Sequence, residues 1–290
     1  MPTKLGAQWI DVPSPAKKDL EWLAKKFHLH PIITEELAGP SARSHVESYD
    51  HYLYLIYYFP VYDPKEQTSR RTEIDFLITK DHVVTVHYED IEALAYLKDR
   101  TDTDSFRLTY KILESLFNFQ ERQLRHIREK TEAIGSELFK DDEKNVLRKI
   151  SRLKRDISEY RIIVRHQGPI LKSLLGNGLK FWGDDARVYL EDLVGDHTKI
   201  TDQVNGYRDA VGDFEDTNNQ LMSVKTNEVM KTFTTLSFLT FPFMLLAAIF
   251  SMNTKGTPIV DLPNSFWIIL SGMGIAMVTL IAYFKKKEWL

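Results

Sequence analysis

The 290-residue sequence contains no cysteine, so disulfide bonds, thiolate metal sites, iron–sulfur clusters and cysteine nucleophiles are excluded. It also lacks a Gly-x-x-x-x-Gly-Lys-Ser/Thr phosphate-binding loop, so no motif indicates an ATP-driven machine. The formal net charge of -3 argues against bulk attraction to nucleic acid, and no nucleic-acid partner is expected. Residues 1–12 lack the long apolar core of a signal peptide.

Two stretches near the C-terminal end lack any acidic, basic or histidine side chain: residues 232–250 and 265–284. Each has about 20 residues, the length of helix that crosses the hydrocarbon core of a bilayer. A buried hairpin in a soluble domain is the alternative, but a soluble helix of this length normally shows a polar face. We therefore predict transmembrane helices at 232–250 and 265–284, an extracytoplasmic loop at 251–264 and a basic tail at 285–290.

Lysines lie beside both predicted membrane helices, at Lys225, Lys231, Lys285, Lys286 and Lys287. The loop between the helices contains only Lys255 and Asp261. Because segments rich in lysine stay on the cytoplasmic side, both termini are expected in the cytoplasm. The chain is thus expected to pass twice through the cell membrane (plasma or inner membrane), with the lipid bilayer as a partner.

The first hundred residues mix helix and strand patterns. Apolar residues at helical spacing predict a helix from Lys17 to Phe27, with Ser14 before Pro15 as its start signal. Strands are predicted at His51–Pro60, Glu73–Thr79 and His82–Tyr88, and a further helix at Ile91–Leu97. The last two strands form a predicted hairpin around Lys80 and Asp81. Residues 1–100 are therefore predicted to form an N-terminal α/β domain.

Residues 101–183 carry apolar side chains at a spacing of three to four throughout. We predict a helical pair, Ser105–Phe139 and Asp141–Leu175, with a kink at Gly168-Pro169. The glycines between 176 and 183 predict a turn after the pair.

A heptad pattern follows over residues 184–231, which we call the stalk. Its seam consists of Leu193, His197, Ile200, Val204, Tyr207, Val211, Phe214, Asn218 and Leu221. Because no proline occurs from 184 to 241, one helix is predicted to run from the stalk into the first membrane stretch. A helix this long is not stable alone in water, so the seam is expected to pack against other chains.

The charges of the stalk and of the helix before it are opposite in sign. Residues 184–230 contain eleven acidic and four basic side chains, whereas residues 143–172 contain three acidic and nine basic ones. Two solvated helix faces would explain this pattern. The functional interpretation is that cations gather near an acidic stalk, with a basic collar nearby.

The residues around the membrane stretches follow a specific order. Asn227-Glu228-Val229-Met230-Lys231 precedes a stretch with Pro242, Met252-Asn253 follows it, and the second stretch ends in Lys285-Lys286-Lys287-Glu288-Trp289-Leu290. This order resembles the CorA family of divalent-cation channels. The α/β domain, the helical pair and the acidic stalk resemble that family more loosely.

The resemblance implies an α+β cytoplasmic domain with a long stalk helix and two transmembrane helices, assembled as a funnel-shaped homopentamer. It implies Mg²⁺ as the transported and regulatory ion and no organic cofactor. The first membrane helix would line the pore. Carried over residue by residue, the selectivity filter would comprise Asn253, Met252 and Ser251, and the pore lining and gate would comprise Asn227, Met230, Phe233, Phe241 and Met244. Asp192 and Asp196 are the candidate ligands of regulatory divalent cations.

The sequence departs from the family signature Gly-Met-Asn at its first position, which is Ser251 here. Serine lacks the backbone freedom that glycine gives a turn leaving a helix. Three functions therefore stay open: a channel for Mg²⁺ and also Co²⁺ or Ni²⁺, a Zn²⁺ transporter of the same superfamily, and a non-conducting membrane-anchored pentamer with a sensing or structural role.

An enzyme is not expected, because no nucleophile motif or paired-carboxylate pattern is present. His28 and His30 are typical of a surface loop, and His197 of a polar residue in a helix seam. His87 with Glu89 and Asp90 fits either a carboxylate–histidine cluster or a strand end entering a turn.

Overall fold

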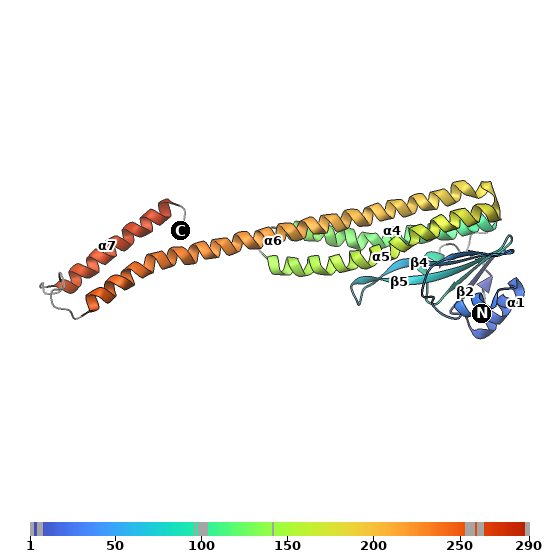
Figure 1. The fold of residues 1–290 in the computed structure, drawn as a ribbon, viewed down its shortest axis with the longest axis horizontal. Coiled ribbons are helices and arrows are strands. Elements are labelled where there is room, and N and C mark those ends of the chain that lie inside the picture. Colours follow the sequence, from blue (N-terminus) through green and yellow to red (C-terminus); the bar gives the residue numbers. More distant parts are fainter. Residues whose placement is uncertain are drawn as a thin grey trace. The chain divides into compact units, whose positions relative to one another are not determined.

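A computed structural model describes residues 3–4, 8–95, 97, 104–140, 142–252, 259 and 264–287 of the chain. The chain divides into two compact units, Met1–Glu215 and Asp216–Leu290. The first contains a mixed sheet with helices, and the second contains the end of one long helix and one further helix (Figure 1).

The sheet has six strands in the order β1-β2-β6-β5-β4-β3. Their bounds are Thr3–Lys4 for β1, Trp9–Pro13 for β2, Val46–Ser48 for β3, Leu53–Asp63 for β4, Thr68–Ile78 for β5 and Val83–His87 for β6. β2 and β6 are parallel, and the other neighbours are antiparallel. The three predicted strands and the hairpin are confirmed as β4, β5 and β6. The sequence did not predict β1, β2 or β3. β1 and β3 are very short, and the buried residues of β2 follow one another without the alternation of apolar and polar side chains that indicates a strand.

Three short helices accompany the sheet: α1 (Lys17–Phe27), α2 (Pro31–Glu36) and α3 (Glu92–Ala95). α1 occupies the predicted residues, but Ser14 is not its start signal. Ser14 has φ 47°, and its N–H donates to the His87 carbonyl at 2.7 Å. The Asp19 carboxylate instead accepts from the N–H of Ala16 at 3.1 Å and caps the helix in place of Ser14.

The sheet lies between two helical layers. One face packs on α1 and α2 through a buried cluster that includes Ile10, Val12, Leu23, Ile33 and Ile56. The other face packs on α4 (Ser105–Glu137) and α5 (Glu143–Trp182), where Tyr57 meets Phe117 and Phe59 meets Phe119 with ring centroids 6.3 and 6.1 Å apart. Figure 1 shows α1 on one side of the sheet and α4 and α5 on the other. Burial on both faces explains the continuous apolar run of β4.

The predicted turn between residues 176 and 183 is wrong, because α5 continues to Trp182. Gly178 serves close packing: a Cβ there would lie 2.8 Å from the side chain of Leu190. The helix ends at Gly183, whose φ of 95° favours glycine. A short 3₁₀ turn, η1 (Asp184–Ala186), then leads into α6 (Arg187–Ser251), a 65-residue helix.

The expectation that the stalk seam packs against other chains is corrected for the part of α6 within the first unit. The seam residues Leu193, Ile200, Val204 and Val211 are buried within this single chain. The partners are α4 and α5. The ring of Phe214 lies against Gly135 of α4, and the imidazole of His197 lies against Gly168 of α5.

A buried charge network fastens the β4–β5 hairpin to the two helices. Asp156 of α5 is fully buried and accepts hydrogen bonds from the Ser69 N–H and hydroxyl, each at 2.8 Å. His126 Nε2 lies 2.8 Å and Lys130 Nζ 3.3 Å from its other oxygen. Burial alone would raise the pKa of Asp156, but His126, Ser69 and Lys130 outweigh it and hold that pKa below its ordinary value.

Asp156→Ala should lower the stability of the full chain by about 3–5 kcal/mol, because it leaves buried donors and Lys130 without their counter-charge. Thermal unfolding of the purified protein in detergent measures the loss. Glu132→Ala, at an exposed ion pair with Arg128, is the matched control and should change stability by less than about 0.5 kcal/mol. Equal effects of the two substitutions would contradict the structural role of Asp156.

Candidate functional site

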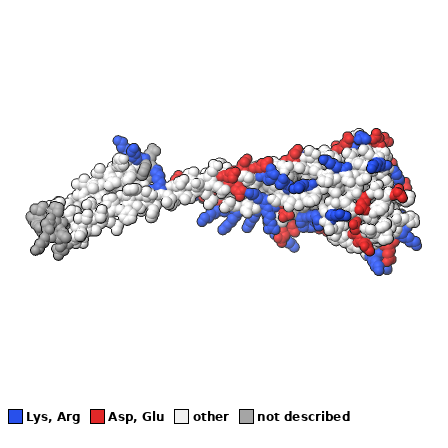
Figure 2. Space-filling model, in the orientation of Figure 1, with Lys and Arg blue, Asp and Glu red and all other residues white. Residues whose placement is uncertain are grey.

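Two helices are long and apolar enough to cross a membrane: the C-terminal part of α6 and α7 (Ser265–Lys286). Charged side chains cover much of the rest of the protein, whereas the end of α6 and most of α7 are almost entirely white in Figure 2. Large apolar side chains such as Phe238, Ile275 and Val278 are exposed on both helices. A surface of this kind is stable in lipid or against further protein, not in water.

The predicted pore residues of α6 lie on one face of that helix. At 3.6 residues per turn, Asn227, Met230, Phe233, Phe241 and Met244 fall within an arc of about 120°. All five are exposed, the four apolar ones by 58–67%. We call this face the α6 stripe.

Two buried residues of α6 lie away from the stripe. Thr235 and Leu239, 1% and 8% exposed, lie about 140° and 180° from the middle of the α6 stripe. Farther along, α6 and α7 together line a cavity of about 510 Å³ that includes Phe250 and Phe266. α7 therefore packs beside α6 away from the middle of the stripe, and the five stripe residues stay exposed in the described part of this unit.

The predicted filter residues lie at the end of α6. Ser251 is its last helical residue, and Met252 follows with its N–H donating to the Ile249 carbonyl at 3.1 Å. Both side chains are exposed. Asn253 lies outside the described residues. Because the backbone of Ser251 is helical, serine meets no strain at the position where the family signature has glycine.

The acidic candidates lie on the first unit, between α4 and α6. The Tyr110 hydroxyl is 2.7 Å from Asp192 Oδ2 and 3.1 Å from Glu114 Oε1, so its single proton can serve one carboxylate at a time. Asp196 is half-buried one turn away. Burial and the charge of Asp192 raise the pKa of Asp196, with smaller contributions from Glu114 and Glu121. Four carboxylates are thus gathered on one surface.

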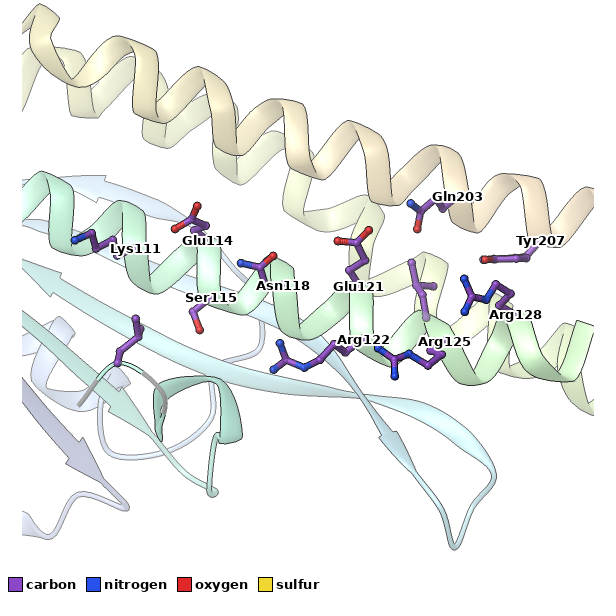
Figure 3. A pocket seen from close by; sticks show the side chains of 12 residues that line it. Lys111, Glu114, Ser115, Asn118, Glu121, Arg122, Arg125, Arg128, Gln203 and Tyr207 are labelled. Carbon is purple, nitrogen blue, oxygen red and sulfur yellow. The ribbon is translucent and has the colours of Figure 1, made fainter. Parts of the chain in front are cut away.

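A groove of about 840 Å³ continues from these residues along α4 and α6, and its side chains are shown in Figure 3. It is lined by Glu114, Glu121, Arg122, Arg125, Arg128, Gln203 and Tyr207, among others. Lys199 pairs with Glu121 at 2.9 Å. Within the described residues, no group of three or more acidic or histidine side chains is arranged to hold a metal ion. Asp192 and Asp196 therefore do not by themselves form such a group in the described part of one chain.

Sequence reasoning missed Glu114 and Tyr110, which sit 78 and 82 positions before Asp192 in the sequence numbering. No local spacing could have linked them to the stalk. Their i,i+4 relation on one helix was visible, but such pairs are common on solvated helix faces.

The histidine candidates have structural roles. The partner of His87 is Asp11, whose Oδ1 lies 3.2 Å from His87 Nε2, while Nδ1 contacts the Glu89 carbonyl at 2.6 Å. The Glu89 carboxylate pairs with Arg70. His28 ends α1 in a left-handed conformation, and His30 Nδ1 accepts from the Ile32 N–H at the start of α2.

Known proteins match nearly the whole chain. A family model described as CorA-like Mg²⁺ transporter protein matches residues 4–286. The cobalt/magnesium transport protein CorA of Thermotoga maritima is 25% identical, over 97% of this chain and 83% of that protein. That of Methanocaldococcus jannaschii is 22% identical, over 97% and 91%. The complete structure of the CorA magnesium transporter from Methanocaldococcus jannaschii covers 97% of this chain and 91% of its own, with a TM-score of 0.85 at 21% identity, which shows the same fold.

The absence of native cysteine makes the α6 stripe directly testable. Phe241→Cys and Met244→Cys should react readily with a charged, water-soluble thiol reagent in membranes, because the stripe is expected to face water. Thr235→Cys and Leu239→Cys, at the two buried positions, are the matched controls and should react more slowly. The rates are read by mass spectrometry of the intact chain. Equal protection of all four thiols would show that the stripe faces lipid or protein.

Proposed function

The chain belongs to the CorA-like Mg²⁺ transporter family, and on that basis we propose that it is a channel through which hydrated Mg²⁺ enters the cell passively. The observation that carries the proposal is the α6 stripe, an exposed face of a membrane-length helix that also packs beside α7. Co²⁺ and Ni²⁺ are further expected ions, since they have the same charge and also bind six water molecules.

In the proposed assembly, a homopentamer, five stripes surround a central pore and five copies of α7 lie outside. Met230 and Phe233 form an apolar constriction that closes by dewetting, and Phe241 and Met244 face the lumen nearer the outside. Asn227 lies at the cytoplasmic end. The soluble unit and both termini are cytoplasmic, as the flanking lysines indicate.

The outer filter in this proposal is a ring of five Asn253 side chains, with Met252 and Ser251 beside it. Mg²⁺ is small, prefers octahedral coordination and loses water slowly, so a fast filter does better to hold the hydrated ion. Amide oxygens accept hydrogen bonds from that water shell without the strong trap that five carboxylates would make. Weak binding lets the ion leave again.

The membrane potential is a sufficient driving force. A divalent ion that enters a negative-inside cell gains about 4.6 kcal/mol per 100 mV, twice the value for a single charge. An open pore would therefore fill the cell with Mg²⁺ unless the ion itself closes it. We assign this feedback to the acidic surface of Asp192, Asp196 and Glu114, whose crowded carboxylates attract a divalent cation. Ligands from a neighbouring subunit would complete the site.

Mg²⁺ flux into proteoliposomes tests the channel. Stopped-flow fluorescence should show Mg²⁺ uptake that rises with an inside-negative potential, while Zn²⁺ uptake is much smaller. Faster Zn²⁺ uptake would identify a zinc transporter, and no uptake of either ion would identify a non-conducting assembly. Asn253→Ala should abolish uptake while the oligomer, measured by light scattering, stays intact. Phe139→Ala, an exposed residue of the first unit, is the control and should conduct normally.

The regulatory assignment has its own test. Asp192→Asn and Glu114→Gln should each keep the channel open at internal Mg²⁺ concentrations that close the unchanged protein, because the charge that binds the closing ion is reduced. The half-closing Mg²⁺ concentration, measured in vesicles of defined internal Mg²⁺, should rise severalfold. Asp184→Asn, an exposed acid that pairs with Arg187, is the control and should leave it unchanged. An unaltered value in both variants would remove these residues from the regulatory site.

A further inference from the structure

Two acidic side chains lie inside the apolar layer between the sheet and α2. Asp75 and Glu73 belong to β5, where Asp75 pairs in register with Ile56 and Glu73 with Tyr58 of β4. Asp75 is fully buried and Glu73 is 6% exposed. Because alternate residues of a strand share a face, both carboxyls point the same way, toward α2 and residues 38–43. Burial of two acids in such a layer requires a compensating partner.

Hydrogen bonds connect this pair to residues 38–43, which we call the α2–β3 segment. The Ser41 N–H lies 2.9 Å from both oxygens of Glu73, and the Tyr58 hydroxyl donates to the Ser41 carbonyl at 2.8 Å. The Tyr88 hydroxyl donates to Asp75 Oδ2 at 2.9 Å. Glu73 and Tyr58 therefore hold the segment to the sheet.

Several buried polar atoms beside these contacts have no hydrogen-bond partner among the described residues. They include Asp75 Oδ1, the hydroxyl oxygen of the fully buried Tyr54, the Ser41 hydroxyl and Glu36 Oε2. Such atoms are rare in folded proteins, and each costs about 1–3 kcal/mol when left unsatisfied. The buried pocket therefore lacks hydrogen-bonding protons, or a ligand, for the two acceptors Asp75 Oδ1 and Glu36 Oε2.

Within the described residues, no lysine or arginine forms an ion pair with Asp75 or Glu73, although the charge of Arg71 acts to lower the pKa of Glu73. The titratable and charged groups that face the pair are Glu36 from α2, Tyr54 and Tyr58 from β4, Arg71 from β5 and Tyr88 after β6, with His45 3.5 Å from Glu36. Only Arg71 carries a fixed positive charge, and its guanidinium lies 4.3 Å from the ring of Tyr58.

A metal ion does not fit this pocket as it stands. No three acidic or histidine side chains of the described residues converge on a point where they could hold one. A proton fits better, because it turns Asp75 Oδ1 from an orphaned acceptor into a donor toward the Glu73 carboxylate. Burial and the charge of Glu73 raise the pKa of Asp75 well above its ordinary value, which agrees with this protonation.

We propose that Asp75 and Glu73 bind one shared proton at neutral pH, and that this proton latches the α2–β3 segment to the sheet. When Asp75 ionises, two adjacent negative charges repel each other and Glu36, and the Ser41 contacts weaken. Cavities of about 520 Å³ and 300 Å³ border the segment at Pro40, so water can enter as the segment moves away. The proposal makes the first unit sensitive to cytoplasmic alkalinisation.

Asp75→Asn tests the latch, because asparagine has the shape of the protonated acid, keeps a donor toward Glu73 and cannot ionise. Since the folded-state pKa of Asp75 is raised, the unfolded chain releases this proton first, so stability falls as pH rises above the unfolded value of about 3.9 and levels off once Asp75 ionises in the folded protein. The unchanged full chain in detergent should therefore lose thermal stability relative to Asp75→Asn as pH increases from 5 to 9. The folded-to-unfolded ratio should fall up to about tenfold per pH unit relative to the variant until Asp75 is ionised.

Hydrogen exchange supplies the local readout. After correction for intrinsic rates, amides of residues 36–45 should lose protection with rising pH in the unchanged chain and keep it in Asp75→Asn. Asp81→Asn, at an exposed turn, is the matched control and should behave like the unchanged chain. His87 titrates in all three proteins, so its contribution cancels in the comparison.

Two results would overturn the latch. If Asp75→Asn is less stable than the unchanged chain at pH 8, or fails to fold, Asp75 acts as a carboxylate. If Mg²⁺ added after EDTA treatment stabilises the unchanged chain but not Asp75→Asn, the pocket binds the cation and not a proton. Neither readout involves transport, so the latch and the channel can fail separately.

Discussion

The burial of the α6 seam is the contact on which the order of the first unit depends. The sheet supports α4 and α5 through aromatic contacts such as Tyr57 with Phe117, and α4 and α5 in turn cover Leu193, Val204 and Val211 of α6. A helix as long as α6 is not stable alone in water. Its stability therefore depends on packing against α4 and α5, which in turn pack on the sheet. The same packing brings Tyr110 and Glu114 of α4 against Asp192 and creates the acidic surface.

Much of the fold could be predicted because apolar periodicity is a local signal. α1, the central strands and the long helices all follow it, and the charge-free stretches identify the end of α6 and α7. The errors occur where tertiary packing decides the role of a residue. Gly178 looks like a turn former but permits close packing on Leu190, and Ser14 resembles a cap but occupies a strand-to-helix connection. The seam was identified correctly, but sequence cannot tell whether its partner is the same chain or another.

The candidate sites also differ in whether a local sequence signal or tertiary packing brings their residues together. The α6 stripe lies along a single helix, so its one-sided arrangement follows from residue numbers alone. The surface of Asp192 with Glu114 and the pair of Asp75 with Glu73 depend on which strands and helices meet. In the sequence, Glu73 and Asp75 alternate with apolar residues and would be assigned to a solvent-facing side of a strand. They are buried because α2 and the α2–β3 segment cover them, and that segment has no strong pattern of its own.

The exposed apolar stripe has a consequence for assembly. In the proposed pore the stripe faces the lumen, and the remaining apolar surface of the two helices meets lipid tails that are as apolar as its own side chains. Neither surface therefore fixes by itself how many chains gather. That information has to come from surfaces in water, where charge and shape discriminate between partners. In the proposed assembly, the first unit would therefore have to supply the contacts that fix the number of subunits.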